Sequence, residues 1–126
     1  MKKLLAGLFI FSTMLLGTKA FGMGFSEGLS QSKPMAVLIY ADWADNVQAI
    51  VTAFQLQSQQ VGDKYNFVTL NIADKAAKEF NARYHIYPNL PYVLLFKNNG
   101  KISRYVQKDC VLNSSCFAEK IKNFAN

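Results

Sequence analysis

The chain has 126 residues, enough for one domain, and its composition is 51% hydrophobic and 13% aromatic. These values exclude a disordered or low-complexity chain. Three of the 14 basic residues lie within the first 19 positions, and the others are scattered among 8 acidic residues. Since the basic residues do not cluster with aromatic ones, we expect no nucleic-acid partner.

The N-terminus has the three parts of a secretory signal peptide. Lys2 and Lys3 give a basic start, residues 4–16 form an apolar run interrupted only by Gly7, Ser12 and Thr13, and Ala20 or Gly22 offers a small residue for cleavage. The charge-free stretch of 15 residues over 4–18 is shorter than the roughly 20 residues of a membrane-spanning helix. We therefore expect a signal peptide over 1–22, a mature domain over 23–126 without a stable membrane span, and a periplasmic or secreted location in a bacterium.

The first half of the mature chain predicts two strands separated by a long helix. Residues 34–40 form a nearly continuous apolar run, typical of a strand buried on both faces, and residues 25–32 before it predict a weak helix. Residues 45–61 carry apolar side chains at helical spacing, with Asp42 or Asp45 as the candidate N-cap. Apolar and polar residues alternate enough over 66–72 to predict a second strand.

The second half predicts a helix, a hairpin and a final helix. Asp74 is the candidate N-cap of a helix that ends at Tyr84. Residues 92–96 and 101–106 flank a turn of Asn98, Asn99 and Gly100 and predict a hairpin. The last helix is expected over 113–124. The order β-α-β-α-β-β-α predicts an α/β fold, with a mixed sheet of about four strands and helices on both faces. Each crossover helix is expected to join parallel strands.

The chain has two cysteines, Cys110 and Cys116, and in an oxidising compartment such a pair is a disulfide candidate. Cys110 is expected in a loop and Cys116 in the first turn of the last helix. The pair is interpreted either as a structural link or as a redox pair, because a helix N-terminus lowers a thiol pKa. The chain has one histidine, His85, remote from both cysteines, so we expect no metal site and no cofactor.

Several segments resemble thioredoxin in order and spacing over residues 33–124. Residues 33–43 (KPMAVLIYADW) resemble the strand that leads into the thioredoxin active site, and residues 71–73 (NIA) resemble the end of the next strand. Residues 84–86 (YHI) followed by 90–101 (LPYVLLFKNNGK) resemble the segment that holds the family's cis-proline. The resemblance implies a thioredoxin-like fold.

The departures from thioredoxin lie at the positions that carry its chemistry. The family has a Cys-x-x-Cys loop after the tryptophan, whereas here Trp43 is followed by Ala44 and Val47 at the two cysteine positions. The family's buried acid aligns with Leu38, and the lysine near it aligns with Thr69. Because disulfide exchange needs a thiolate, the resemblance implies that this site has no catalytic residues.

The resemblance also implies a groove in which an extended peptide could add as a strand. Its residues would be Trp43, the cis pair Leu90 and Pro91, and Tyr92, with the loop through Cys110 closing the third side and Tyr87 and Pro88 beside it. Two alternatives stay open: Trp43 could simply fill the core, and Pro91 could only shape a turn.

These observations favour an exported thioredoxin-fold protein that binds a polypeptide or a partner protein in the cell envelope. The alternative is a thiol-disulfide oxidoreductase or redox sensor that uses Cys110 and Cys116, and only this alternative makes the protein an enzyme.

Overall fold

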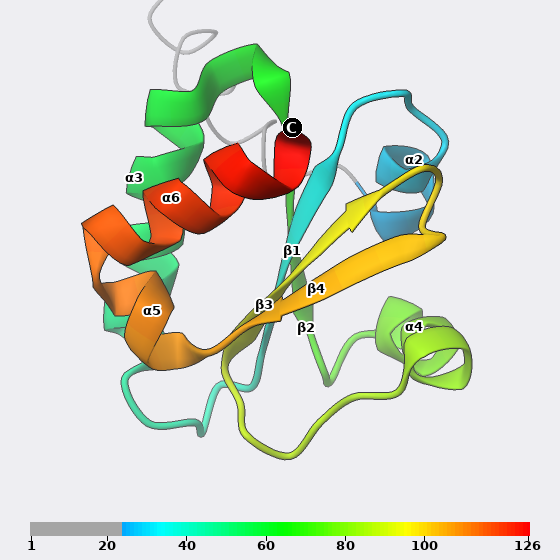
Figure 1. The fold of residues 1–126 in the computed structure, drawn as a ribbon. Helices are drawn as coiled ribbons and strands as arrows, with labels where there is room; N and C mark the ends of the chain where they lie inside the picture. Colours follow the sequence, from blue (N-terminus) through cyan, green and yellow to red (C-terminus); the bar gives the residue numbers. More distant parts are fainter. Residues whose placement is uncertain (1–23) are drawn as a thin grey trace, which may run out of the picture.

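The structure, a computed structural model, describes residues 24–126; the signal peptide expected over 1–22 lies outside these residues. In chain order the elements are α2 (Phe25–Leu29), β1 (Met35–Tyr40), α3 (Val47–Val61), the 3₁₀-helix η1 (Gly62–Lys64), β2 (Asn66–Asn71), α4 (Lys75–Tyr84), β3 (Tyr92–Lys97), β4 (Ile102–Val106), α5 (Lys108–Leu112) and α6 (Ser114–Ala125). They form a four-stranded mixed sheet with helices on both faces, as the sequence predicted (Figure 1).

The strands lie in the order β2-β1-β3-β4, so β1 is central. Met35 of β1 pairs with Asn66 of the parallel strand β2 and with Phe96 of the antiparallel strand β3. The expectation that both crossover helices join parallel strands is correct for α3 and wrong for α4. The seven residues between α4 and β3 let the chain reverse its direction, and β3 enters the sheet on the far side of β1.

Each face of the sheet has its own hydrophobic core, because alternate side chains of a strand point to opposite faces. Val37 and Ile39 of β1 face α2 and α4, whereas Ala36 and Leu38 face α3, α5 and α6. On the first face, Phe25 of α2 packs edge-on against several aromatic rings; on the second, Phe54 of α3 contacts rings from β2 and α6. The partners are Phe80, Tyr84 and Phe96 for Phe25, and Phe67 and Phe117 for Phe54.

Helix α3 begins two residues later than predicted. Its N-cap is Asn46, whose φ of 60° is left-handed, and no side chain caps the helix. Neither Asp42 nor Asp45 therefore has the capping role that the sequence suggested. Asp42 instead accepts a hydrogen bond from the Asn71 side-chain amide through Oδ1 at 3.1 Å, which ties the end of β1 to the end of β2.

Helix α5 was not predicted, and it corrects the placement of Cys110 in a loop. Its five residues bury Cys110 and Val111 in the core shared by α3 and α6. A helix this short has too few turns to produce a periodic pattern, and its formation depends on tertiary packing.

Candidate functional site

Trp43 lies in the loop between β1 and α3, and 73% of its surface is exposed. The interpretation that it fills the core is therefore wrong. Its neighbour Ala44 is buried, and the Ala44 amide donates a hydrogen bond to the Ala41 carbonyl at 3.0 Å. This tight turn points the Ala44 side chain into the core and leaves the Trp43 indole in solvent.

The segment beneath Trp43 is apolar. Ala44 is buried, Val47 is half-buried at the first turn of α3, and Leu38 on β1 has no exposed surface. Thr69 of β2 is the direct partner of Leu38 in the parallel ladder. Leu38 and Thr69, which were expected to align with the family's acid and its neighbouring lysine, therefore lie next to each other in the sheet.

The Leu90–Pro91 peptide bond is cis. Both residues are buried, and the Leu90 amide donates to the Pro88 carbonyl at 2.9 Å. A bound chain would therefore have to displace this bond before it could pair with the amide. The Leu90 carbonyl has no backbone partner within residues 24–126 and remains the acceptor that an added strand could use.

Three tyrosines pack together beside this loop and form what we call the tyrosine cluster: Tyr87, Tyr92 and Tyr105. Ring centroids are separated by 5.5 Å for Tyr87 and Tyr92, 5.1 Å for Tyr92 and Tyr105, and 5.6 Å for Tyr87 and Tyr105. Tyr92 has no exposed surface, and its hydroxyl accepts a hydrogen bond from the Tyr87 amide at 3.0 Å. Tyr92 thus supports the surface from below and cannot contact a bound chain, which corrects its expected role beside the groove.

Tyr87 and Tyr105 supply the exposed part of the tyrosine cluster, at 45% and 40% exposure. Burial raises the pKa of the Tyr105 phenol above its ordinary value near 10, as it does for Tyr92. The sequence analysis did not single out Tyr105. Its exposure could have been inferred from the strand itself, because successive side chains of β4 point to opposite faces of the sheet. Tyr105 therefore lies on the opposite face from the buried Val106.

A cavity of about 290 Å³ adjoins the tyrosine cluster, and we call it the Asn89 cavity. It lies between the loop before β3 and the start of α5, and its lining residues are Asn89, Tyr105, Gln107, Lys108 and Asp109. In Figure 1 the loop after β1, the loop before β3 and the start of α5 lie at the same end of the sheet. The three segments expected to surround a groove are therefore gathered at one end, although the third side is the first turn of a helix.

Cys110 of α5 and Cys116 of α6 form a disulfide with a Cα–Cα distance of 5.2 Å. Cys110 is buried and Cys116 half-buried. As expected, Cys116 lies in the first turn of the last helix, where its amide donates to Oδ1 of the N-cap Asn113 at 3.1 Å. The disulfide fixes α5, which forms one wall of the Asn89 cavity, to α6.

Comparison with solved structures finds the same fold in two thioredoxins and in human ERp44. Thioredoxin from Malassezia sympodialis superposes with a TM-score of 0.63 at 18% identity, covering 81% of this chain and 84% of that one. Thioredoxin from Fasciola hepatica gives 0.59 at 15% identity, covering 74% and 82%. Human ERp44 gives 0.62 at 21% identity, with 81% of this chain matching 27% of that larger protein. The chain has a thioredoxin-like fold.

Sequence comparison gives a more limited result. No protein-family model matches the chain. Thioredoxin-like protein HCF164 of Arabidopsis thaliana, a chloroplastic protein, is 36% identical over 62 residues, which are 49% of this chain and 24% of that protein. The chain thus spans about a quarter of the length of this curated relative.

On this thioredoxin-like fold, the loop after β1 contains no cysteine. The two cysteines of the chain lie in α5 and α6, where they are paired with each other. Within residues 24–126, His, Cys, Asp and Glu side chains do not gather in groups of three that could hold a metal ion. Every helix in the same part of the chain is too short or too polar to span a bilayer.

Proposed function

We propose that the protein is exported and binds a polypeptide, or an extended segment of an envelope protein, at the surface around Trp43, Leu90 and the tyrosine cluster. The observation that carries the proposal is the exposed Trp43. Because the tight turn holds Trp43 in solvent, the fold lacks the roughly 2 kcal/mol of stabilisation that burial of this side chain would contribute. Tryptophan is also among the residues most enriched at binding hot spots.

The neighbouring groups support an extended ligand. Tyr87 and Tyr105 offer flat apolar area, and the Leu90 carbonyl offers a backbone acceptor. The Asn89 cavity could take one side chain of such a ligand, with Lys108 and Asp109 at its wall. None of these features needs a thiol, so binding and disulfide exchange are separable on this scaffold.

Export completes the proposal. It is supported by the signal-peptide pattern of residues 1–22 and by a paired disulfide, which persists in oxidising compartments. Mass spectrometry of the protein isolated from cells should find a new N-terminus near Ala20 or Gly22. An intact Met1 on the exported protein would argue against cleavage.

Trp43 is the sole tryptophan of the chain and therefore reports on its own site. We would select peptides from a random library displayed on phage and titrate them while recording tryptophan emission. A bound peptide should shift the emission to shorter wavelength. Trp43→Ala should weaken binding, followed with labelled peptide, by at least fivefold, or about 1 kcal/mol, while the circular dichroism spectrum is retained.

Leu56→Ala is the matched control, because Leu56 is another exposed apolar side chain (54%) but lies on α3. It should leave peptide affinity unchanged. Peptides that bind the Trp43→Ala protein as tightly as the parent would refute the proposed surface.

Dithiol–disulfide exchange by Cys110 and Cys116 is the second candidate function. The half-buried Cys116 in the first turn of α6 favours it, because a helix N-terminus stabilises a thiolate. The burial of Cys110 in the core favours a structural bond. Titration against glutathione separates the two: a structural disulfide should have a reduction potential below about −300 mV, and a working pair a higher one.

A further inference from the structure

The strand β4 forms an open edge of the sheet. It pairs with β3 on one side, and the backbone groups that point away from β3 have no backbone partner within residues 24–126. Figure 1 shows β4 as the outermost strand, on the opposite side of the sheet from β2. Four of the five residues of β4 are exposed, whereas four of the six residues of β2 are buried. Of the two edge strands, β4 is therefore the one that is accessible to another chain.

The side chains of β4 differ between the two faces of the sheet. Arg104 pairs with Leu95, so it lies on the face covered by α6, and Ile102 shares that face. Tyr105 pairs with Leu94 and lies on the opposite face. Ile102 and Tyr105 are 42% and 40% exposed. One face of the edge thus offers a cation beside an apolar side chain, and the other face offers an aromatic ring.

The hairpin of β3 and β4 carries an excess of positive charge. Residues 97–106 contain no acidic side chain and three basic ones, which are Lys97, Lys101 and Arg104. Lys97 and Arg104 lie over the same ring, that of Phe124, at 4.9 and 5.9 Å from its centroid. Within the described part of the chain, none of the three basic side chains forms an ion pair. Their charge is therefore available to an external partner.

This charge decides which kind of strand fits the edge. Basic side chains on an edge strand oppose pairing with an identical strand, because like charges across from each other are destabilising. A second copy of this protein would bring the same cations together. An acidic strand meets no such repulsion, since its carboxylates are complementary to Lys101 and Arg104 and its apolar side chains can cover Tyr105 on the other face.

We propose that the outer edge of β4 binds an extended acidic segment of a partner protein, which adds to the sheet as a further strand. In this mode of recognition, main-chain hydrogen bonds give affinity and side chains at alternate positions give specificity. The segment places glutamate or aspartate on the face of Arg104 and apolar residues on the face of Tyr105. The inference does not rest on the peptide surface around Trp43, with which this edge shares Tyr105 alone.

The probe is a capped peptide of alternating glutamate and valine, titrated into the ¹⁵N-labelled protein and followed by amide chemical shifts. The shifts should saturate with a midpoint at or below about 1 mM, and amides at alternate positions over 102–106 should become protected from hydrogen exchange. N-methylation of the glutamates removes the amide protons of one edge of the peptide, and N-methylation of the valines removes those of the other edge. One of these two peptides should bind and the other should not, because only one edge of the added strand pairs with β4.

Charge variants test the complementarity. Lys101→Gln with Arg104→Gln should weaken binding of the glutamate peptide by at least fivefold. Lys75→Gln with Lys78→Gln on α4 is the matched control, because it makes the same change in net charge at exposed positions and should have no effect. Lys101→Glu with Arg104→Glu should reverse the preference, so that a peptide of alternating lysine and valine binds better than the glutamate peptide. Damage to the fold would not produce this gain.

Trp43→Ala separates this edge from the peptide surface. It should weaken binding of the library peptides and leave binding of the glutamate peptide unchanged, so each proposal can fail without the other. The proposal is overturned if the shifts do not saturate, if the two N-methylated peptides behave alike, or if charge reversal leaves the preference unchanged. Protection of β4 amides that rises with protein concentration alone would identify a second copy as the occupant and would also overturn it.

Discussion

Removal of the Cys110–Cys116 disulfide should destabilise the protein by about 3 kcal/mol. The cysteines are six residues apart in sequence, and cross-linking a loop of that size removes denatured-state entropy worth about 2 kcal/mol. In the pair Cys110→Ala and Cys116→Ser, the buried sulfur of Cys110 is also lost, which adds about 1 kcal/mol of packing.

Urea denaturation followed by circular dichroism measures this loss. With an m-value of about 2 kcal/mol/M, the midpoint should fall by about 1.5 M. The parent protein under reducing conditions is the matched control, because it loses the cross-link and keeps both sulfurs, and its midpoint should fall by about 1 M. Because α5 forms a wall of the Asn89 cavity, both proteins should also bind selected peptides several-fold more weakly. An unchanged midpoint would show that α5 is held by Val111 and its other contacts alone, and would refute this reasoning.

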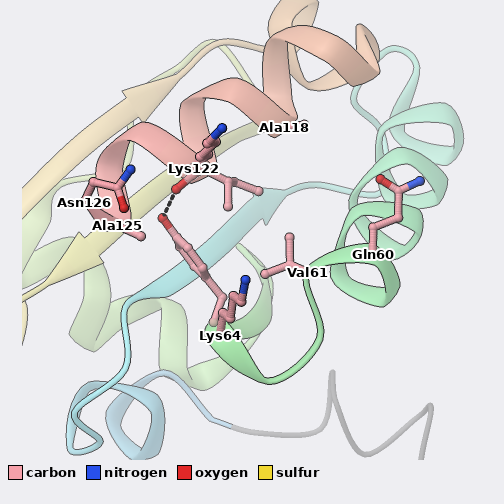
Figure 2. A pocket seen from close by; sticks show the side chains of 9 residues that line it. Gln60, Val61, Lys64, Ala118, Lys122, Ala125 and Asn126 are labelled. Carbon is pink, nitrogen blue, oxygen red and sulfur yellow. Dashed lines mark hydrogen bonds between the residues drawn. The ribbon is translucent and has the colours of Figure 1, made fainter.

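Three further predictions concern Tyr65, Leu38 and the loop after β1. Tyr65→Phe should cost about 1 kcal/mol by removing the bond to the Ile121 carbonyl (dashed line in Figure 2). Burial raises the pKa of Tyr65 to about 12 from the usual value near 10. The contribution of the neutral phenol to the free energy of unfolding should therefore be lost as pH rises from about 10 to 12. Denaturation curves of Tyr65→Phe should show a smaller loss of stability over this pH range than those of the parent protein. Leu38→Asp should cost about 3 kcal/mol or more at pH 7 and less at pH 4, because burial raises the carboxyl pKa and the neutral form is tolerated better; equal loss at both pH values would contradict this account. Reduction of insulin by dithiothreitol should not be accelerated, since Ala44 and Val47 cannot supply a thiolate, and turnover that survives replacement of both cysteines would show that the site was placed wrongly.

The elements that the sequence predicted well are those whose burial follows a simple period. The run of residues 35–40 is buried almost throughout, and α3 buries Ile50 and Phe54 at helical spacing. In both cases local hydrophobic pattern and tertiary burial agree. The direction of β3 could not be predicted in this way, because an apolar run indicates burial and contains no information about the direction of its neighbours.

The candidate site was predicted less completely, because exposure at a loop depends on backbone turns that composition does not encode. Trp43 could have been core or surface until the turn at Ala41 and Ala44 placed it in solvent. Tyr92 follows Pro91 and was expected beside the groove, but as the first residue of β3 it is buried under Tyr87 and Tyr105.

The central position of β1 has a consequence for how the chain must fold as it is made. Synthesis proceeds from the N-terminus, so β1 is complete long before either of its neighbours. Met35 must wait for Asn66 and then for Phe96, and at about 5–20 residues per second the longer interval lasts about 3–12 s. Both edges of this apolar strand lack a native partner until β2 is made, and one edge stays open until the hairpin arrives. Through that interval the open edge is available to chaperones and to other nascent chains.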